Sequence, residues 1–137
     1  MLNSSRTSRR ILLLIVILAG AFIARFFLIS RLDQRVIYSD EQKNLAIAEH
    51  LTSGAGYSIA EGRPTAVIPA GYPLWLAALR LAGLPDPAQV RWAQLVLSLL
   101  TIVIVYFFSR MLFGEIAALL AAAGCALYPY FIFLPGT

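Results

Sequence analysis

Long apolar runs separated by one polar stretch dominate the pattern along the chain. The first run covers residues 11–30 and follows a polar tail at 1–10, which carries Arg6, Arg9 and Arg10 and no acidic residue. A helix of about twenty residues rises roughly 30 Å, enough to cross the hydrocarbon core of a bilayer. The pattern therefore predicts a tail at 1–10 and a first transmembrane helix at 11–30.

A cleaved signal peptide is the alternative for this first run, because a basic start and small residues around Gly20 also fit that class. The apolar run continues through residues 26–29, which favours an uncleaved anchor. Arg25 interrupts the run near its far end. We expect its side chain to extend toward the lipid headgroups.

A second long apolar run follows at 92–113, with Trp92 and Tyr106 toward its ends, as in many membrane helices. We expect it to form a second transmembrane helix, after a polar external loop at 31–91.

A third apolar run covers 115–134, and Gly114 before it permits a tight reversal. The run is rich in alanine, which suits close helix packing in lipid, and Pro129 is expected to bend it. The fold class predicted from these three runs is all-α, a polytopic membrane protein with three transmembrane helices.

The loop at 31–91 contains signals for a first short helix. Ser39 is a suitable N-cap, Gln42 stands at the capping-box spacing, and Gly54 is placed to end the helix. These signals predict a helix at about 40–53.

A second short helix is expected from Pro73 to a stop at Gly83, with turns and room for a short hairpin at 54–64. About ten residues are too few to span a bilayer. We expect this helix to lie in the membrane interface, with Tyr72 and Trp75 at headgroup level.

Composition supports the membrane class. The 137 residues are 60% hydrophobic and only 13% charged, with a mean hydropathy of +0.78. The net charge is +4, but the Lys and Arg residues form no basic stripe, so a nucleic-acid partner is not expected. Cys125 is the only cysteine, which excludes an intrachain disulfide and a cysteine zinc site.

The arginine-only tail favours a cytoplasmic N-terminus. With that orientation the loop at 31–91 is periplasmic or extracellular. The expected location is the inner (plasma) membrane, as a multi-pass protein.

Asp40 and Glu41 form an acidic pair beside the first predicted span, where a carboxylate could do chemistry. Helical spacing puts Lys43 and Asn44 on the face of Asp40, within its reach. Considered alone, the pair is explained more simply by the positive end of the helix dipole. His50, the lone histidine, is expected to be a solvated helix residue without a partner.

The ordered set of features resembles a known family. The basic start and the arginine-interrupted first run are followed by SDEQKNLAIAEHL, a Pro-x-Gly-Tyr-Pro-Leu turn, VYFFSRMLFG and ALYPYFIFLPGT. Together they resemble the N-terminal part of the GT-C membrane glycosyltransferases. The nearest branch is the protein mannosyltransferase and aminoarabinose transferase group, with the related bacterial lipopolysaccharide sugar transferases.

The resemblance implies inverting transfer of a sugar from a polyprenyl-phosphate carrier to an acceptor on the non-cytoplasmic face. By the same match Asp40 is the catalytic base and Glu41 supports it or shapes the site. Lys43 and Tyr72 are candidate substrate-binding residues. No second acidic metal ligand is identifiable, so no metal or other cofactor is assigned.

Family members continue through many more spans, so the chain is expected to be truncated after residue 137 and inactive alone. It would then need the missing C-terminal helices or a membrane partner. The alternative is a small non-catalytic membrane protein that packs against a larger partner and binds through its external loop.

Overall fold

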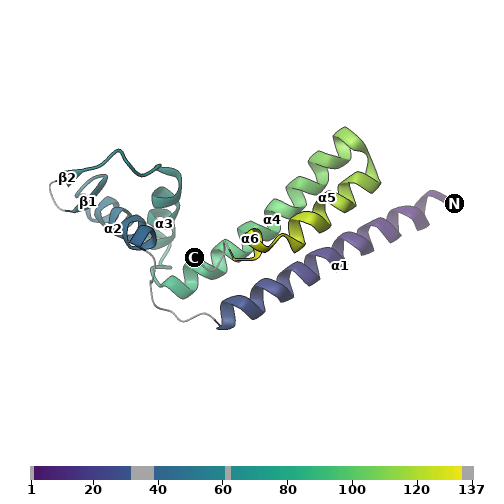
Figure 1. Ribbon diagram of the computed structural model, residues 1–137, viewed down its shortest axis with the longest axis horizontal. Helices are drawn as coiled ribbons and strands as arrows, with labels where there is room; N and C mark the ends of the chain where they lie inside the picture. The colour runs from purple at the N-terminus through teal and green to yellow at the C-terminus, as the bar shows by residue number, and fades with distance from the viewer. Residues whose placement is uncertain (1, 32–38, 61–62, 134–137) are drawn as a thin grey trace. The chain divides into compact units, whose positions relative to one another are not determined.

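The computed structural model describes the backbone of residues 2–31, 39–60 and 63–133, and the side chains of 8–31, 40–60 and 63–133 (Figure 1). The chain divides into two compact units, each described by itself. We call 1–32 with 91–136 the helical unit, and 33–90 the loop unit. Most described residues are helical, as predicted, but the loop unit also contains a two-stranded hairpin.

Two helices of the helical unit are long and apolar enough to cross a membrane. They are residues 8–31 of α1 (Leu2–Arg31) and the whole of α4 (Pro87–Phe113), whose first turn belongs to the loop unit. Most of their side chains are exposed, because the neighbouring helices of the unit cover only part of the surface of each helix. Helical structure in α1 begins within the predicted tail, and α4 begins before the predicted start at residue 92.

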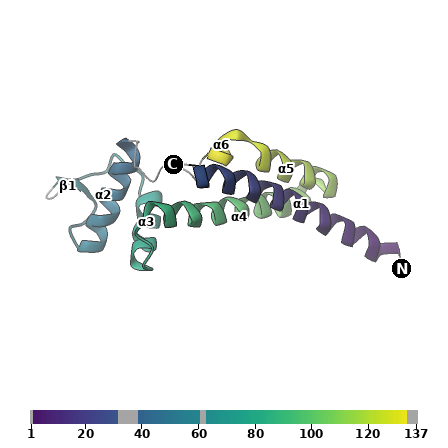
Figure 2. The same ribbon diagram turned by 90° about the horizontal axis from the view of Figure 1, so that it is seen from below.

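The helices α1, α4 and α5 (Glu115–Leu127) run side by side (Figures 1 and 2). The buried side chains between them are Ala118, Ala122 and Ala126 of α5 together with Ala21, Ile102 and Tyr106. Alanines four residues apart lie on one helix face, and their small side chains let helix backbones approach closely. The predicted role of alanine in packing therefore matches the core of this unit.

The third apolar run is interrupted rather than bent. Helix α5 ends at Leu127, Tyr128 is extended with φ −65° and ψ 119°, and α6 (Pro129–Phe133) begins at the proline. Proline disfavours helical geometry in the residue before it, which explains the break at Tyr128. The prediction of one continuous helix over 115–134 was wrong, since α5 has only 13 residues.

The side chain of Arg25 does not have the exposed position that the sequence predicted. It is fully buried, and its Nη1 donates to the carbonyl oxygens of Ala21 (3.1 Å) and Ala126 (3.2 Å). The expected extension to the headgroups is therefore corrected. The side chain is held inside the unit because the last carbonyls of a helix lack intrahelical donors, and Arg25 supplies one to α5.

In the loop unit, α2 (Ser39–Ser53) packs on α3 (Gly71–Leu81). The buried apolar side chains of the pair are Ile47, Ala48, Leu76, Ala77 and Leu79. Arg80 of α3 also lies 3.6 Å from Glu49 of α2, measured from Nη2 to Oε1. The two short helices thus form one packed layer rather than two separate segments.

Both short helices end at the predicted glycines. After α2, Ala55 N donates to His50 O at 2.8 Å and Gly54 N to Leu51 O at 3.4 Å, with Gly54 at φ +84°. This is the Schellman arrangement, which needs a left-handed residue that glycine adopts most readily. The arrangement recurs at Gly83 after α3.

The starts of the two helices agree less well with the sequence. The side chain of Ser39, the predicted N-cap of α2, lies outside the described residues. Helix α3 begins at Gly71, two residues before the predicted start, and its first backbone bond is Leu74 N to Ala70 O at 3.0 Å. Pro73 is still in the first turn, where its missing N–H leaves no helical acceptor unpaired.

Candidate functional site

A groove of about 580 Å³ lies within the loop unit. Its walls come from the start of α2, from β1 (Ser58–Ala60), from the segment that follows β2 (Arg63–Pro64) and from the start of α3. Three of the four predicted site residues line it, namely Asp40, Lys43 and Tyr72. Glu41, the fourth, is half-buried and is not among the lining residues.

Asp40 presents its carboxylate at the surface, with 87% of the side chain exposed. Its Oδ1 lies 3.3 Å from Nζ of Lys43, and the Nδ2 group of Asn44 donates to its backbone carbonyl at 2.8 Å. These contacts follow from the i+3 and i+4 spacing that the sequence predicted. Because the side chain of Asp40 is exposed and lines the groove, its carboxylate is accessible to a ligand there.

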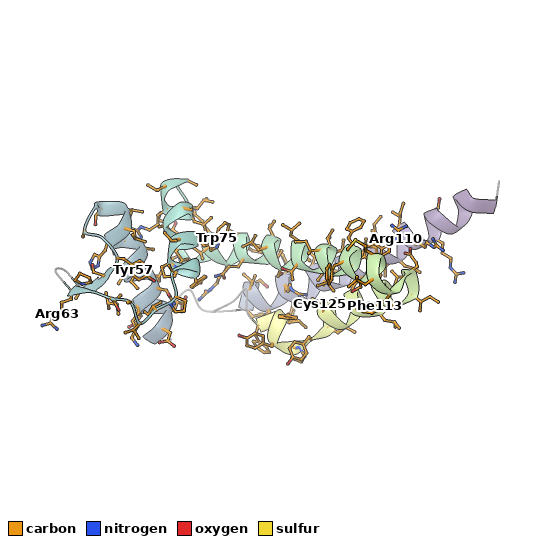
Figure 3. All side chains as sticks on the ribbon, turned by 90° about the horizontal axis from the view of Figure 1, so that it is seen from above. Tyr57, Arg63, Trp75, Arg110, Phe113 and Cys125 are labelled. Carbon is orange, nitrogen blue, oxygen red and sulfur yellow. The ribbon has the colours of Figure 1, made fainter. Side chains whose placement is uncertain are left out.

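Another part of the groove lining, the segment 65–68, is held by two hydrogen bonds to Tyr57, which is labelled in Figure 3. The Tyr57 hydroxyl donates to the carbonyl of Ile68 at 2.8 Å, and the Tyr57 carbonyl accepts from Thr65 N at 3.0 Å. These two bonds fix both ends of the segment 65–68. Thr65 and Ile68 are thereby kept as lining residues of the groove.

The strands β1 and β2 pair antiparallel, with Ser58 opposite Pro64 and Ala60 opposite Arg63. The sequence left room for a short hairpin at 54–64, and the described strands occupy that segment. The hairpin is an exception to the all-α fold class, and it matters because Ile59 of β1 lines the groove.

His50 joins the hairpin to α2. Its Nδ1 lies 2.7 Å from the carbonyl oxygen of Ser58 and 3.1 Å from Oγ of the same residue, and Ser58 is 1% exposed. A carbonyl oxygen can only accept, so the short contact indicates a protonated Nδ1 that donates to it. The expectation that His50 is solvated and without a partner was wrong.

Two polar lining residues, Asn44 and Thr65, had not been assigned a role from the sequence. Asn44 was expected only as a neighbour of Asp40, and its Oδ1 is buried without a hydrogen-bond partner among the described residues. Thr65 reaches the groove through the path of the chain after β2. Helical spacing could have pointed to Asn44, but no local pattern signals a residue placed by a loop.

Arg31 and Arg35 are basic residues that follow the first predicted span in the sequence. The guanidinium of Arg31 lies 4.6 Å from the ring centre of Phe27, and Arg35 lies outside the described residues. In the described part of the chain, no group of three or more His, Cys, Asp or Glu side chains is arranged to hold a metal ion. That the function uses no metal ion stays a prediction.

Comparison of the chain with models of protein families, with curated proteins and with solved structures found no match in any of the three.

Proposed function

We propose that the chain is the N-terminal, catalytic-loop part of an integral-membrane glycosyltransferase. It would move a sugar from a polyprenyl-phosphate carrier to a lipid, glycan or protein acceptor on the non-cytoplasmic face. The family resemblance suggests the reaction. The observation that supports it is that Tyr72 of α3, distant in the sequence, lines the same groove as Asp40 and Lys43 of α2.

Asp40 is the proposed general base. Its carboxylate takes the proton of an acceptor hydroxyl while the hydroxyl oxygen bonds to the anomeric carbon of the donor sugar. The bond from that carbon to the carrier phosphate breaks, and the phosphate leaves with the electron pair. Attack opposite to the leaving group inverts the anomeric carbon.

Lys43 supplies positive charge beside the base, with its Nζ 3.3 Å from Oδ1 of Asp40. Its side chain is 45% exposed, so it can also contact a phosphate that enters the groove. Tyr72 contributes a ring at the start of α3 to the same surface, and aromatic side chains commonly pack against ligands in such sites. Glu41 is proposed to support α2 near Asp40 rather than to touch the ligand.

The membrane arrangement we propose has a cytoplasmic N-terminus and a loop unit on the other side. α1 and α4 are the first two crossings, and α5 with α6 form the third. We further propose that α3 lies in the interface, because Leu74, Ala78 and Leu81 leave an exposed apolar stripe on it. Its end at Leu81 is only a few residues from the start of α4.

A small non-catalytic membrane protein is the second candidate. Only 11% of the apolar window in α1 and 17% of that in α4 is buried within the chain. Such open faces suit packing against the helices of a larger partner as well as against lipid. Continuing membrane spans in the gene downstream of residue 137 would favour the transferase, and an unrelated neighbouring gene would favour this candidate.

The test of the transferase is Asp40→Asn in the chain joined to downstream membrane helices of its own gene or of a related transferase. The substitution keeps the size of the side chain but removes the proton acceptor. Sugar transfer from a polyprenyl-phosphate donor should fall by roughly 10²- to 10⁴-fold at equal expression.

Glu49→Gln is the matched control for this substitution. Glu49 lies on α2 away from the groove, where it pairs with Arg80, and an exposed pair of this kind contributes about 0 to 1 kcal/mol. Its loss should therefore leave turnover nearly unchanged. Equal activity of the two variants would remove Asp40 from the reaction.

A further inference from the structure

One carboxylate at the start of α5 contacts charged and polar side chains from α1 and α4 of the helical unit. Glu115, the first residue of α5, accepts a hydrogen bond of 2.6 Å from the Tyr106 hydroxyl at Oε1. Its Oε2 lies 3.0 Å from Nε of Arg110 in α4 and 3.7 Å from Nη1 of Arg10 in α1. The contacts tie the three helices together at the turn between α4 and α5.

Positive charge exceeds negative charge at this place. Glu115 is only 15% exposed, whereas the side chains of Arg10 and Arg110 are 41% and 48% exposed. Arg9, next to Arg10, is exposed as well. We call Arg9, Arg10 and Arg110 the arginine cluster; against the single carboxylate of Glu115 it leaves a net charge of +2.

The arginines still have donors to offer. Arg110 contacts Glu115 through Nε at 3.0 Å, and 48% of its side chain is exposed, so its terminal nitrogen groups can reach a further acceptor. Arg10 reaches the carboxylate only at 3.7 Å. A guanidinium group carries five N–H donors and binds phosphate oxygens in a two-pronged geometry. The cluster is therefore charged and incompletely paired.

Apolar side chains flank the cluster. Met111, Phe113 and Ile116 are 74%, 74% and 78% exposed at the same turn. Figure 3 shows Arg110 and Phe113 together at the end of α4. Inorganic phosphate has no apolar part that could contact exposed apolar side chains next to it. A phospholipid has one, and its headgroup and its acyl chains need the two kinds of surface side by side.

We propose that the arginine cluster binds the headgroup of an anionic phospholipid, whose acyl chains lie against Phe113 and Ile116. The inference rests on the membrane insertion of α1 and α4 in the proposed function, and not on sugar transfer. It assigns a ligand to residues that have no part in the groove. Glu115 is the positioning residue, because it holds Arg10 of α1 and Arg110 of α4 around one point.

The experiment uses the full chain purified in mild detergent and exchanged into mixed micelles with equal amounts of phosphatidylglycerol and phosphatidylcholine. The retained lipids are counted by mass spectrometry. We expect phosphatidylglycerol to be retained in several-fold excess. Arg9→Gln, which removes an exposed side chain and leaves the contacts of Glu115 intact, should reduce that excess up to about fivefold, the effect of one basic residue near an anionic surface.

Arg10→Gln with Arg110→Gln should abolish the preference. Arg63→Gln, an exposed position on β2 with the same change of charge, is the control and should leave it unchanged. Equal retention of the two lipids by the natural chain would overturn the proposal. So would an unchanged preference in the double variant, or displacement of phosphatidylglycerol by millimolar inorganic phosphate.

Alkaline extraction of membranes separates this inference from the proposed function. A chain that resists extraction but shows no lipid preference contradicts only the headgroup site. A chain that alkali releases contradicts the membrane insertion on which both proposals depend.

Discussion

Nη1 of Arg25 in α1 donates a hydrogen bond of 3.2 Å to the carbonyl oxygen of Ala126 in α5, a residue 101 positions further along the chain. Ala126 lies just before the break at Tyr128, where carbonyls have lost their helical donors. In a bilayer, unpaired backbone groups cost several kcal/mol each. Arg25 thus accounts for how a helix can end inside an apolar unit.

Replacing Arg25 should loosen the end of α5 first. In Arg25→Met the carbonyl of Ala126 loses a charge-assisted bond of about 1.5–3 kcal/mol. Hydrogen exchange at the amide of Tyr128, which closes α5 on Gly124 O at 2.9 Å, should accelerate about 10- to 100-fold. Arg31→Met, an exposed position in the last turn of α1, should leave that exchange rate unchanged. The same rate at Tyr128 in both variants would contradict the capping role.

The turn between α4 and α5 depends on a left-handed residue. Gly114 has φ +83°, and a side chain there is strained although an added Cβ would meet no atom within 4 Å. With ψ at −177°, its backbone lies in a region that is essentially restricted to glycine, so Gly114→Ala should lower the free energy of unfolding in detergent by about 1–3 kcal/mol.

Gly124→Ala is the matched change, because Gly124 lies in the interior of α5 with equally open space around it. There alanine should be neutral or stabilise by up to about 1 kcal/mol. Thermal unfolding of both variants measures the contrast. Equal midpoints would show that the left-handed turn carries no cost for alanine.

The sequence predicted those elements that depend on local signals. Gly54 and Gly83 end α2 and α3, and these ends could be predicted because a helix end of this kind requires only a residue that adopts a positive φ. Asp40 lies beside Lys43 because helical spacing alone brings these side chains together. The apolar runs likewise predicted two helices of membrane length from composition and length.

Features decided by distant residues could not be predicted in this way. The buried position of Arg25 depends on Ala126, and the partner of His50 is the backbone of Ser58, which only the hairpin brings near. The sequence predicted a bend at Pro129, whereas the structure has a break at Tyr128. A helix can break at a proline when other donors bind the backbone carbonyls left unpaired there, and the donor here, Arg25, is distant in the sequence. In the candidate site, Thr65 was missed for the same reason, since a loop places it.

The hydrogen bond from Tyr106 to Glu115 should stabilise the helical unit. At 2.6 Å it is a short bond to a carboxylate that is 15% exposed, and such bonds contribute about 1.5–3 kcal/mol. Tyr106→Phe should lower the free energy of unfolding by that amount. Tyr130→Phe removes the same hydroxyl from a side chain that is 62% exposed and should have no measurable effect. Equal losses in the two variants would argue against the bond.

The last prediction concerns orientation in the membrane, tested by single cysteines in a Cys125→Ala background. Ala55→Cys is in the loop unit, and Ser8→Cys is next to Arg9 of the arginine cluster. Both positions are exposed, so a difference in labelling reports the membrane and not burial within the chain. Ser58 would be a poor choice, because it is 1% exposed and bonded to His50.

We expect an impermeant thiol reagent to label Ala55→Cys in spheroplasts and to label Ser8→Cys only after the membrane is opened. The reason is that Arg9, Arg10 and Arg110 lie at the end of the helical unit that carries Ser8, and flanking arginines favour the cytoplasmic side. Labelling of Ser8→Cys alone in closed spheroplasts would reverse the orientation. The groove with Asp40 would then face the cytoplasm, where the proposed acceptor reaction does not take place.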